Sequence, residues 1–167
     1  MERRKPTRLK NYDYSANGYY FITICTAKKQ KILCDIVGEG LCALPKTNLT
    51  KIGKCIDDAL KYINENYDAK ILKYAIMPNH IHFIIKTTGG HGDPPQKMKA
   101  TTGGHGDPPL QDIIGRMKSF TTKQYGETLW QRSFYDHIIR DEKDYLRIWE
   151  YIDTNPQKWT EDKYFAP

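Results

Sequence analysis

The chain has 167 residues, the length of one domain and enough to bury a hydrophobic core. Hydrophobic residues make up 39% of it and charged residues 28%, a balance that argues against a disordered chain. The formal net charge of +6 favours a polyanionic partner such as nucleic acid, although many basic proteins bind none. No apolar run approaches the roughly 18 residues that a membrane helix needs, so we expect no membrane span.

The cysteine pattern and the N-terminal stretch indicate a compartment. Four cysteines are present, in none of the spacings that zinc sites use: Cys25, Cys34, Cys42 and Cys55. Residues 1–10 are charged throughout and do not resemble a signal peptide. We therefore expect reduced thiols in a cytoplasmic protein.

The first half of the chain predicts three main strands, one further short strand and one helix. Residues 1–17 form a basic arm, in which Arg3 and Arg4 either contact a phosphate backbone or belong to a solvated terminus. Residues 19–26 are β-branched and aromatic and predict a strand. Residues 28–45 are expected to be irregular, with a short strand at 31–33. A helix capped by Asn48 or Thr50 follows over 51–64, and two further strands are expected at 70–76 and 80–86.

The second half begins with an internal duplication. Residues 87–95 recur as residues 101–109, and their glycines and prolines predict a surface loop over 87–109. A helix is expected from Leu110, a fourth strand within 129–139, and a last helix from Asp141 to Asn155, where Pro156 ends it. The order strand, helix, strand, strand, helix, strand, helix predicts an α+β, ferredoxin-like (RRM-like) domain spanning 1–167, with an antiparallel sheet and its helices on one face.

Two histidines on the third strand form a candidate metal site. Side chains alternate along a strand, so His80 and His82 point to one face while Ile81 and Phe83 point to the other. Two neighbouring imidazoles can bind one divalent cation. An H-x-H pattern on a strand also arises by chance.

The last helix carries a second candidate pair. Tyr151 and Asn155 are four residues apart and lie on one face of it. The amide oxygen of Asn155 suits Mg²⁺ or Mn²⁺, and Tyr151 can attack a phosphodiester that such an ion polarises. From position alone, Tyr151 would be read as a half-buried packing residue and Asn155 as a helix stop.

Three motifs together resemble a known family. Residues 77–82 (MPNHIH), 130–140 (WQRSFYDHIIR) and 151–156 (YIDTNP) are similar to the REP-associated tyrosine transposases, single-tyrosine members of the HUH endonuclease superfamily. Residues 8–15 and 20–23 resemble that family's entry into its first strand. The resemblance covers nearly the whole chain except the duplicated loop.

The resemblance implies a specific activity. It assigns His80, His82 and Asn155 as ligands of Mg²⁺ or Mn²⁺ and Tyr151 as the nucleophile. Such proteins cut single-stranded DNA beside hairpins and hold the 5′ end as a phosphotyrosine; some act as monomers and others as homodimers. An enzyme of this kind is associated with the nucleoid when it acts on DNA. Further phosphate contacts are expected at Arg132 and Arg140. Arg116 and Lys118 lie on a helix whose basic face could contact DNA or could equally be a solvated face.

Two other functions fit the same residues. A non-catalytic ferredoxin-like module would bind single-stranded nucleic acid through its basic and aromatic residues alone. A metal-dependent phosphodiesterase would use water in place of Tyr151.

Overall fold

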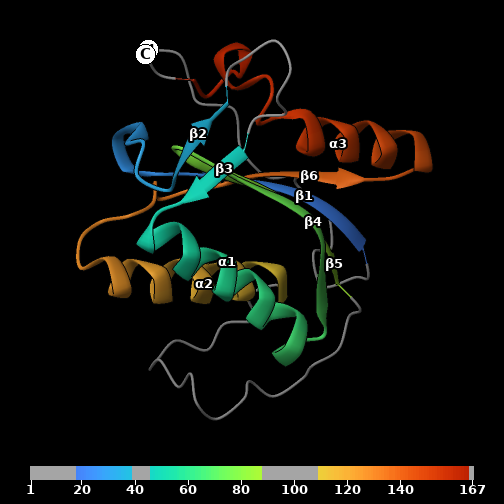
Figure 1. Ribbon diagram of the computed structural model, residues 1–167. Coiled ribbons are helices and arrows are strands. Elements are labelled where there is room, and N and C mark those ends of the chain that lie inside the picture. The colour runs from blue at the N-terminus through green and yellow to red at the C-terminus, as the bar shows by residue number, and fades with distance from the viewer. Residues whose placement is uncertain (1–17, 39–45, 88–108, 166–167) are drawn as a thin grey trace, which may run out of the picture.

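A four-stranded antiparallel sheet forms the centre of the computed structural model, which describes residues 18–38, 46–87 and 109–165 (Figure 1). Its strands are β1 (Gly18–Cys25), β4 (Ala69–Met77), β5 (His80–Thr87) and β6 (Tyr135–Ile139), in the order β4-β5-β1-β6. Each sequence-adjacent pair except the β4–β5 hairpin is joined through a helix, as in a split βαβ arrangement. The α+β, ferredoxin-like prediction is confirmed.

Two helices cover one face of this sheet. They are α1 (Lys51–Asn66) and α2 (Pro109–Tyr125), which lie together below the sheet in Figure 1. Of the two expected caps, Thr50 is the one that caps α1, accepting a hydrogen bond from the backbone N–H of Gly53 at 3.1 Å. Alternate strand residues such as Ile22, Ile81 and Phe83 pack against the two helices and form the larger core.

The third helix, α3 (Glu142–Thr154), lies on the opposite face (Figure 1). The expectation that all helices share one face is therefore wrong. The strands are apolar on both sides, and Phe21 and Ile84 form a second, smaller core with Ile148 and Ile152 of α3. Burying an isoleucine side chain stabilises the fold by about 1.5–3 kcal/mol, so Ile148 and Ile152 hold α3 against the sheet. At its start, Asp141 caps the helix, accepting a hydrogen bond from the backbone N–H of Asp144 at 2.8 Å.

A two-stranded antiparallel sheet occupies part of the region expected to be irregular. Its strands are β2 (Cys34–Val37) and β3 (Lys46–Leu49), and a short 3₁₀ helix η1 (Ala27–Lys29) precedes them. The strand expected at 31–33 begins three residues later, and β3 was not predicted. Gly53 explains how this hairpin joins α1, because a Cβ there would lie 2.0 Å from the carbonyl oxygen of Leu33. The position of the β2–β3 hairpin is therefore set by its packing against α1.

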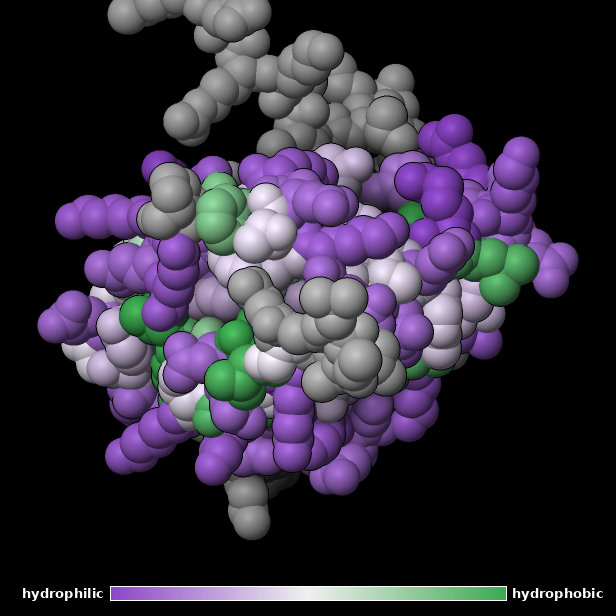
Figure 2. All heavy atoms as spheres, turned by 45° about the horizontal axis from the view of Figure 1, so that its top comes forward, coloured by the Kyte–Doolittle hydropathy of each residue, from purple (hydrophilic) through white to green (hydrophobic). Residues whose placement is uncertain are grey.

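Several predicted features lie outside the described residues. These are the arm 1–17 with Arg3 and Arg4, the interior of the duplicated loop (88–108) and Cys42. The cysteines within the described ranges, Cys25, Cys34 and Cys55, are free thiols. Among the helices in those ranges, none has the length and apolar composition to cross a membrane. The face shown in Figure 2 is dominated by hydrophilic side chains with small apolar areas between them.

Candidate active site

The histidine pair lies on the α3 face of the sheet. The β4–β5 turn leads directly into His80, and strand alternation places His82 beside it, with Cys25 and Thr23 as their partners on β1. Both histidines are fully buried. Their Nε2 atoms face each other at 2.9 Å. Two nitrogens that bind one ion at about 2.1 Å and at right angles lie about 3.0 Å apart, so the observed spacing suits a shared cation.

The other ring nitrogens are held by polar neighbours. Nδ1 of His80 lies 2.8 Å from Oδ1 of Asn79, whose Nδ2 donates to the carbonyl oxygen of Tyr164 at 2.9 Å. Since that leaves Oδ1 as the acceptor, His80 carries its proton on Nδ1. Nδ1 of His82 lies 2.8 Å from Oγ1 of Thr23, which can accept in the same way. This hydrogen bonding frees both Nε2 lone pairs for an ion.

Tyr151 of α3 places its hydroxyl next to the histidine pair. The hydroxyl of Tyr151 lies 3.2 Å from Nε2 of His82, and its ring contacts Phe21 edge to face at 6.0 Å. Ile148 and Ile152 anchor the helix on either side of Tyr151. The histidine pair and the tyrosine, sixty-nine residues apart in sequence, therefore meet within one chain.

Asn155 is the third residue predicted as a metal ligand. Its side chain is 3% exposed, and Nδ2 donates to Oδ2 of Asp162 at 2.7 Å. Within the part of the chain that the structure describes, Oδ1 of Asn155 is the buried side-chain oxygen left without a hydrogen-bond partner. A buried amide oxygen without a donor is costly. A hard divalent cation would satisfy it, so these residues fit Mg²⁺ or Mn²⁺.

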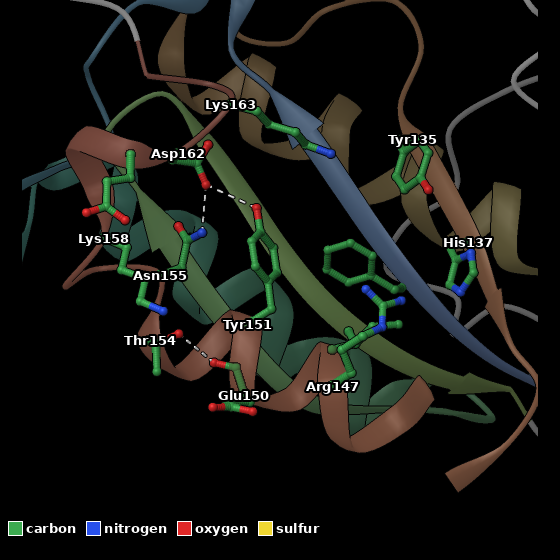
Figure 3. A pocket seen from close by; sticks show the side chains of 13 residues that line it. Tyr135, His137, Arg147, Glu150, Tyr151, Thr154, Asn155, Lys158, Asp162 and Lys163 are labelled. Atoms are coloured by element: carbon green, nitrogen blue, oxygen red, sulfur yellow. Dashed lines mark hydrogen bonds between the residues drawn. The ribbon is translucent and has the colours of Figure 1, made fainter. Parts of the chain in front are cut away.

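Sequence reasoning missed Asp162. Its carboxylate accepts from the Tyr151 hydroxyl at 3.0 Å (Figure 3). A carboxylate oxygen of Asp162 also lies within 4.8 Å of ring nitrogens of His80 and His82. Helical spacing could not reveal it, because it follows Pro156 and the short 3₁₀ helix η3 (Trp159–Glu161). The only sequence signal is that the chain continues past the tyrosine helix with further aromatic residues.

Burial sets the protonation of the site. Desolvation lowers the pKa of His80, and both desolvation and His80 lower the pKa of His82, so both rings are neutral near pH 7. For Tyr151, burial and then the charge of Asp162 raise the pKa of the hydroxyl above its ordinary value. The histidines are ready to bind a cation, whereas the tyrosine holds its proton until something lowers its pKa.

Acid is expected to destabilise the metal-free protein through the histidine pair. A histidine whose folded pKa lies below the unfolded value of about 6.5 takes up a proton on unfolding. The free energy of unfolding should therefore fall as the pH drops below about 6.5, by at most about 1.4 kcal/mol per pH unit for each histidine. Urea unfolding in chelator at pH 7.5, 6 and 5 measures this. A free energy that stays constant over that range would contradict it.

Two of the basic residues expected to contact DNA lie on α2. Nε of Arg116 forms an ion pair with Asp112 at 2.7 Å, on the face of the sheet opposite the histidines. Nζ of Lys118 donates to the carbonyl oxygens of Gln131 and Arg132 at 2.7 and 3.0 Å, and burial lowers its pKa. Lys118 thus connects α2 to the loop before β6, and neither residue is brought to the site.

The other two flank β6. Arg132 is exposed beside Gln131, whose backbone N–H donates to Cys25 at the end of β1 that pairs with His80. Arg140 follows Ile139, which pairs with Tyr19 at the other end of β1. Arg132 therefore lies at the histidine end of the sheet and Arg140 at the other end.

A cleft of about 640 Å³ opens beside the Tyr151 hydroxyl, between α3, the adjacent sheet face and the C-terminal segment (Figure 3). It is lined by aromatic, amide and charged side chains from all three: Phe21, Tyr135, His137, Arg147, Tyr151, Asn155, Lys158, Asp162 and Lys163. Nε2 of His137 pairs with Asp144 at 2.7 Å, separate from the histidine pair. The cleft therefore presents cationic and aromatic side chains next to Tyr151.

The fold and the site together define a class: a ferredoxin-like domain with a buried histidine pair and a helix-borne tyrosine on the same face. Comparison with known proteins then identifies its family. Residues 14–155 match the family described as "Transposase IS200 like", and the chain belongs to that family.

Individual relatives agree with this assignment. An uncharacterised protein of Haemophilus influenzae is 32% identical over 99% of this chain and 95% of its own length. A second H. influenzae protein, named for the REP-associated tyrosine transposases, is 26% identical over 90% of this chain and 77% of its own. A solved REP-associated tyrosine transposase, bound to a REP hairpin, has the same fold, with a TM-score of 0.61 and 21% identity over 93% of this chain and 76% of that one. The chain is a transposase-type enzyme related to the REP-associated tyrosine transposases.

Proposed function

We propose that this chain is a metal-dependent endonuclease and strand transferase for single-stranded DNA, with Tyr151 as its nucleophile. The observation that carries the proposal is the 3.2 Å distance between the Tyr151 hydroxyl and Nε2 of His82, within one chain. The family assignment supports the same chemistry. Since one chain supplies both halves of the site, Tyr151 would act on the DNA bound at its own histidines.

The reaction would be a transesterification. The Tyr151 oxygen attacks the scissile phosphorus and forms a new P–O bond, while the bond to the 3′ oxygen breaks and that oxygen leaves as a 3′-hydroxyl after taking a proton. The 5′ end is then held as a phosphotyrosine. A 3′-hydroxyl of another strand can reverse the step, because the number of phosphodiester bonds is unchanged.

The chain's residues divide this work. His80, His82 and Asn155 would hold Mg²⁺ or Mn²⁺, which would supply Lewis-acid polarisation of a phosphate oxygen and favour loss of the tyrosine proton. Phe21 stacks on His82 at 5.3 Å and contacts Tyr151, so it keeps the two groups aligned and shields them from water.

The substrate is proposed to be single-stranded DNA next to a hairpin. The solved relative is bound to a REP hairpin, and this chain shares its fold. The cleft also supports a single strand, because the cationic side chains of Arg147, Lys158 and Lys163 line it with an exposed aromatic ring.

That ring, Tyr135, is predicted to stack on a base near the scissile phosphate. It is 44% exposed, contacts Phe21 at 6.4 Å, and lies under Nζ of Lys163 at 5.2 Å. Base stacking contributes about 1–3 kcal/mol, so Tyr135→Ala should weaken binding of the single-stranded segment by roughly 5- to 150-fold, whereas Tyr135→Phe should keep most of it. Fluorescence anisotropy with a labelled hairpin bearing a single-stranded flank measures both.

A matched control lies on the neighbouring strand. Tyr19 is 37% exposed and has Nζ of Lys86 over its ring at 5.4 Å, but it pairs with Ile139 at the far end of β1. Tyr19→Ala should leave binding within about twofold. Equal losses for Tyr19→Ala and Tyr135→Ala would show that Tyr135 holds no special position.

The proposal as a whole is tested with a 5′-labelled and a 3′-labelled hairpin strand in Mg²⁺ or Mn²⁺. The expected result is cleavage in which the 5′ end of the released fragment stays attached to protein. Cleavage to a free 5′-phosphate would indicate water as the nucleophile. Binding without cleavage would indicate a non-catalytic nucleic-acid-binding module.

A further inference from the structure

We propose that Asp162 is a positioning residue of the metal site, one that orients the amide of Asn155 so that its oxygen faces the ion. The inference deepens the proposed function and rests on its metal site. It concerns a residue beyond the family match, which ends at residue 155.

The hydrogen bonds of Asp162 fix the amide in one direction. A carboxylate accepts and cannot donate, so the group that lies 2.7 Å from Oδ2 must be the NH₂ of Asn155. The other polar atom of the amide, Oδ1, then points away from Asp162 and has no hydrogen-bond partner among the described residues. With the amide turned over, two oxygens would face each other and the NH₂ would face the ion. Asp162 therefore selects the orientation that can bind a cation.

The segment that carries Asp162 is itself held against the histidines. Oδ1 of Asp162 accepts from the backbone N–H of Tyr164 at 2.6 Å. The ring of Tyr164 lies 4.8 Å from that of His80, and Trp159 is buried 5.9 Å from the same ring. The Tyr164 carbonyl oxygen receives the Asn79 side chain that also fixes the His80 tautomer. One segment thus supports both the histidine and the asparagine.

The negative charge of Asp162 should also raise the affinity of the site for a cation. Two neutral imidazoles and an amide would surround a divalent cation without any negative charge. Asp162 places a carboxylate within 4.8 Å of the histidine nitrogens and so favours the cation electrostatically. Partners of this kind change metal affinity by about 10–100-fold when they are removed.

The experiment measures Mn²⁺ affinity of the full chain by electron paramagnetic resonance, in four forms: wild type, Asp162→Asn, Asn155→Ala and the double variant. Asp162→Asn keeps the shape of the side chain but can donate to the amide, so the amide loses its fixed orientation. Affinity should fall roughly 10–100-fold. If Asp162 acts through Asn155, the same substitution in the Asn155→Ala background should cost less than about threefold.

Two results would overturn the inference. An unchanged affinity in Asp162→Asn would show that it does not support the site, and an equal loss in both backgrounds would show that it acts on the ion directly. Asp153→Asn is the matched control, since it removes one carboxylate from α3 that pairs with Lys73 instead, and its affinity should match wild type. Failure of the wild type to bind Mn²⁺ would instead contradict the metal site of the proposed function.

Discussion

Replacing Tyr151 by phenylalanine is expected to abolish DNA cleavage and covalent attachment, with a loss of roughly a thousandfold or more, as for removal of other catalytic nucleophiles. The substitution removes one oxygen atom, the atom that lies 3.2 Å from Nε2 of His82. The ring remains to pack against Phe21. Cleavage of a labelled hairpin strand, followed on denaturing gels that resolve protein-bound DNA, measures the effect.

The loss must not come from misfolding. Asp162 keeps donors from Asn155 and from the Tyr164 backbone in Tyr151→Phe, so no buried charge is left unpartnered. The variant should therefore bind the hairpin and unfold at the same temperature as wild type within a few degrees. Tyr145→Phe, six residues earlier on α3 and packed on Tyr19, is the control and should cleave normally. Cleavage surviving in Tyr151→Phe would exclude Tyr151 as the nucleophile.

Removing either histidine should abolish the stabilisation that a divalent ion gives. An ion at a hundred times its dissociation constant stabilises a protein by about 2.7 kcal/mol. For a chain of this size that is a rise in Tm of roughly 5–10 °C. His80→Ala and His82→Ala each leave one imidazole, which cannot hold the ion with Asn155 alone, so the rise should disappear together with cleavage.

Scanning calorimetry with and without Mn²⁺ measures this rise. Comparing each variant with itself separates ion binding from any direct effect of the substitution on the buried core. His137→Ala is the matched control, because His137 on β6 pairs with Asp144 of α3 instead, and this variant should retain the full rise. A rise that persists in both His80→Ala and His82→Ala would place the ion elsewhere.

The parts of the site that the sequence could predict are local patterns. His80 and His82 share a face because strands alternate, and Tyr151 and Asn155 share one because helices repeat every 3.6 residues. The order of the elements followed from the same periodicities. The resemblance to a family connected the two halves, which no spacing rule could do across sixty-nine residues.

The parts that escaped prediction depend on packing between distant segments. The prediction of the face that α3 covers was wrong. Phe21 and Ile84 make the second side of the sheet apolar as well, so the strand patterns did not indicate which side a helix would cover. The β2–β3 hairpin is fixed by its contact with α1 at Gly53. Asp162 reaches the site through a turn and a 3₁₀ helix, which carry no periodic signal. Lys118 turned out to bind backbone carbonyls, a tertiary contact that charge alone does not indicate.

The central claim is that Tyr151 becomes covalently attached to DNA, and mapping the attached peptide tests it most directly. The protein is incubated with a hairpin-containing single strand and Mn²⁺, the adduct is digested with protease and nuclease, and the modified peptide is sequenced by mass spectrometry. The account predicts a nucleotide linked through its 5′-phosphate to Tyr151. A nucleotide on Tyr135 or Tyr164, the other tyrosines near the cleft and the histidine pair, would contradict it, as would cleaved DNA with no adduct.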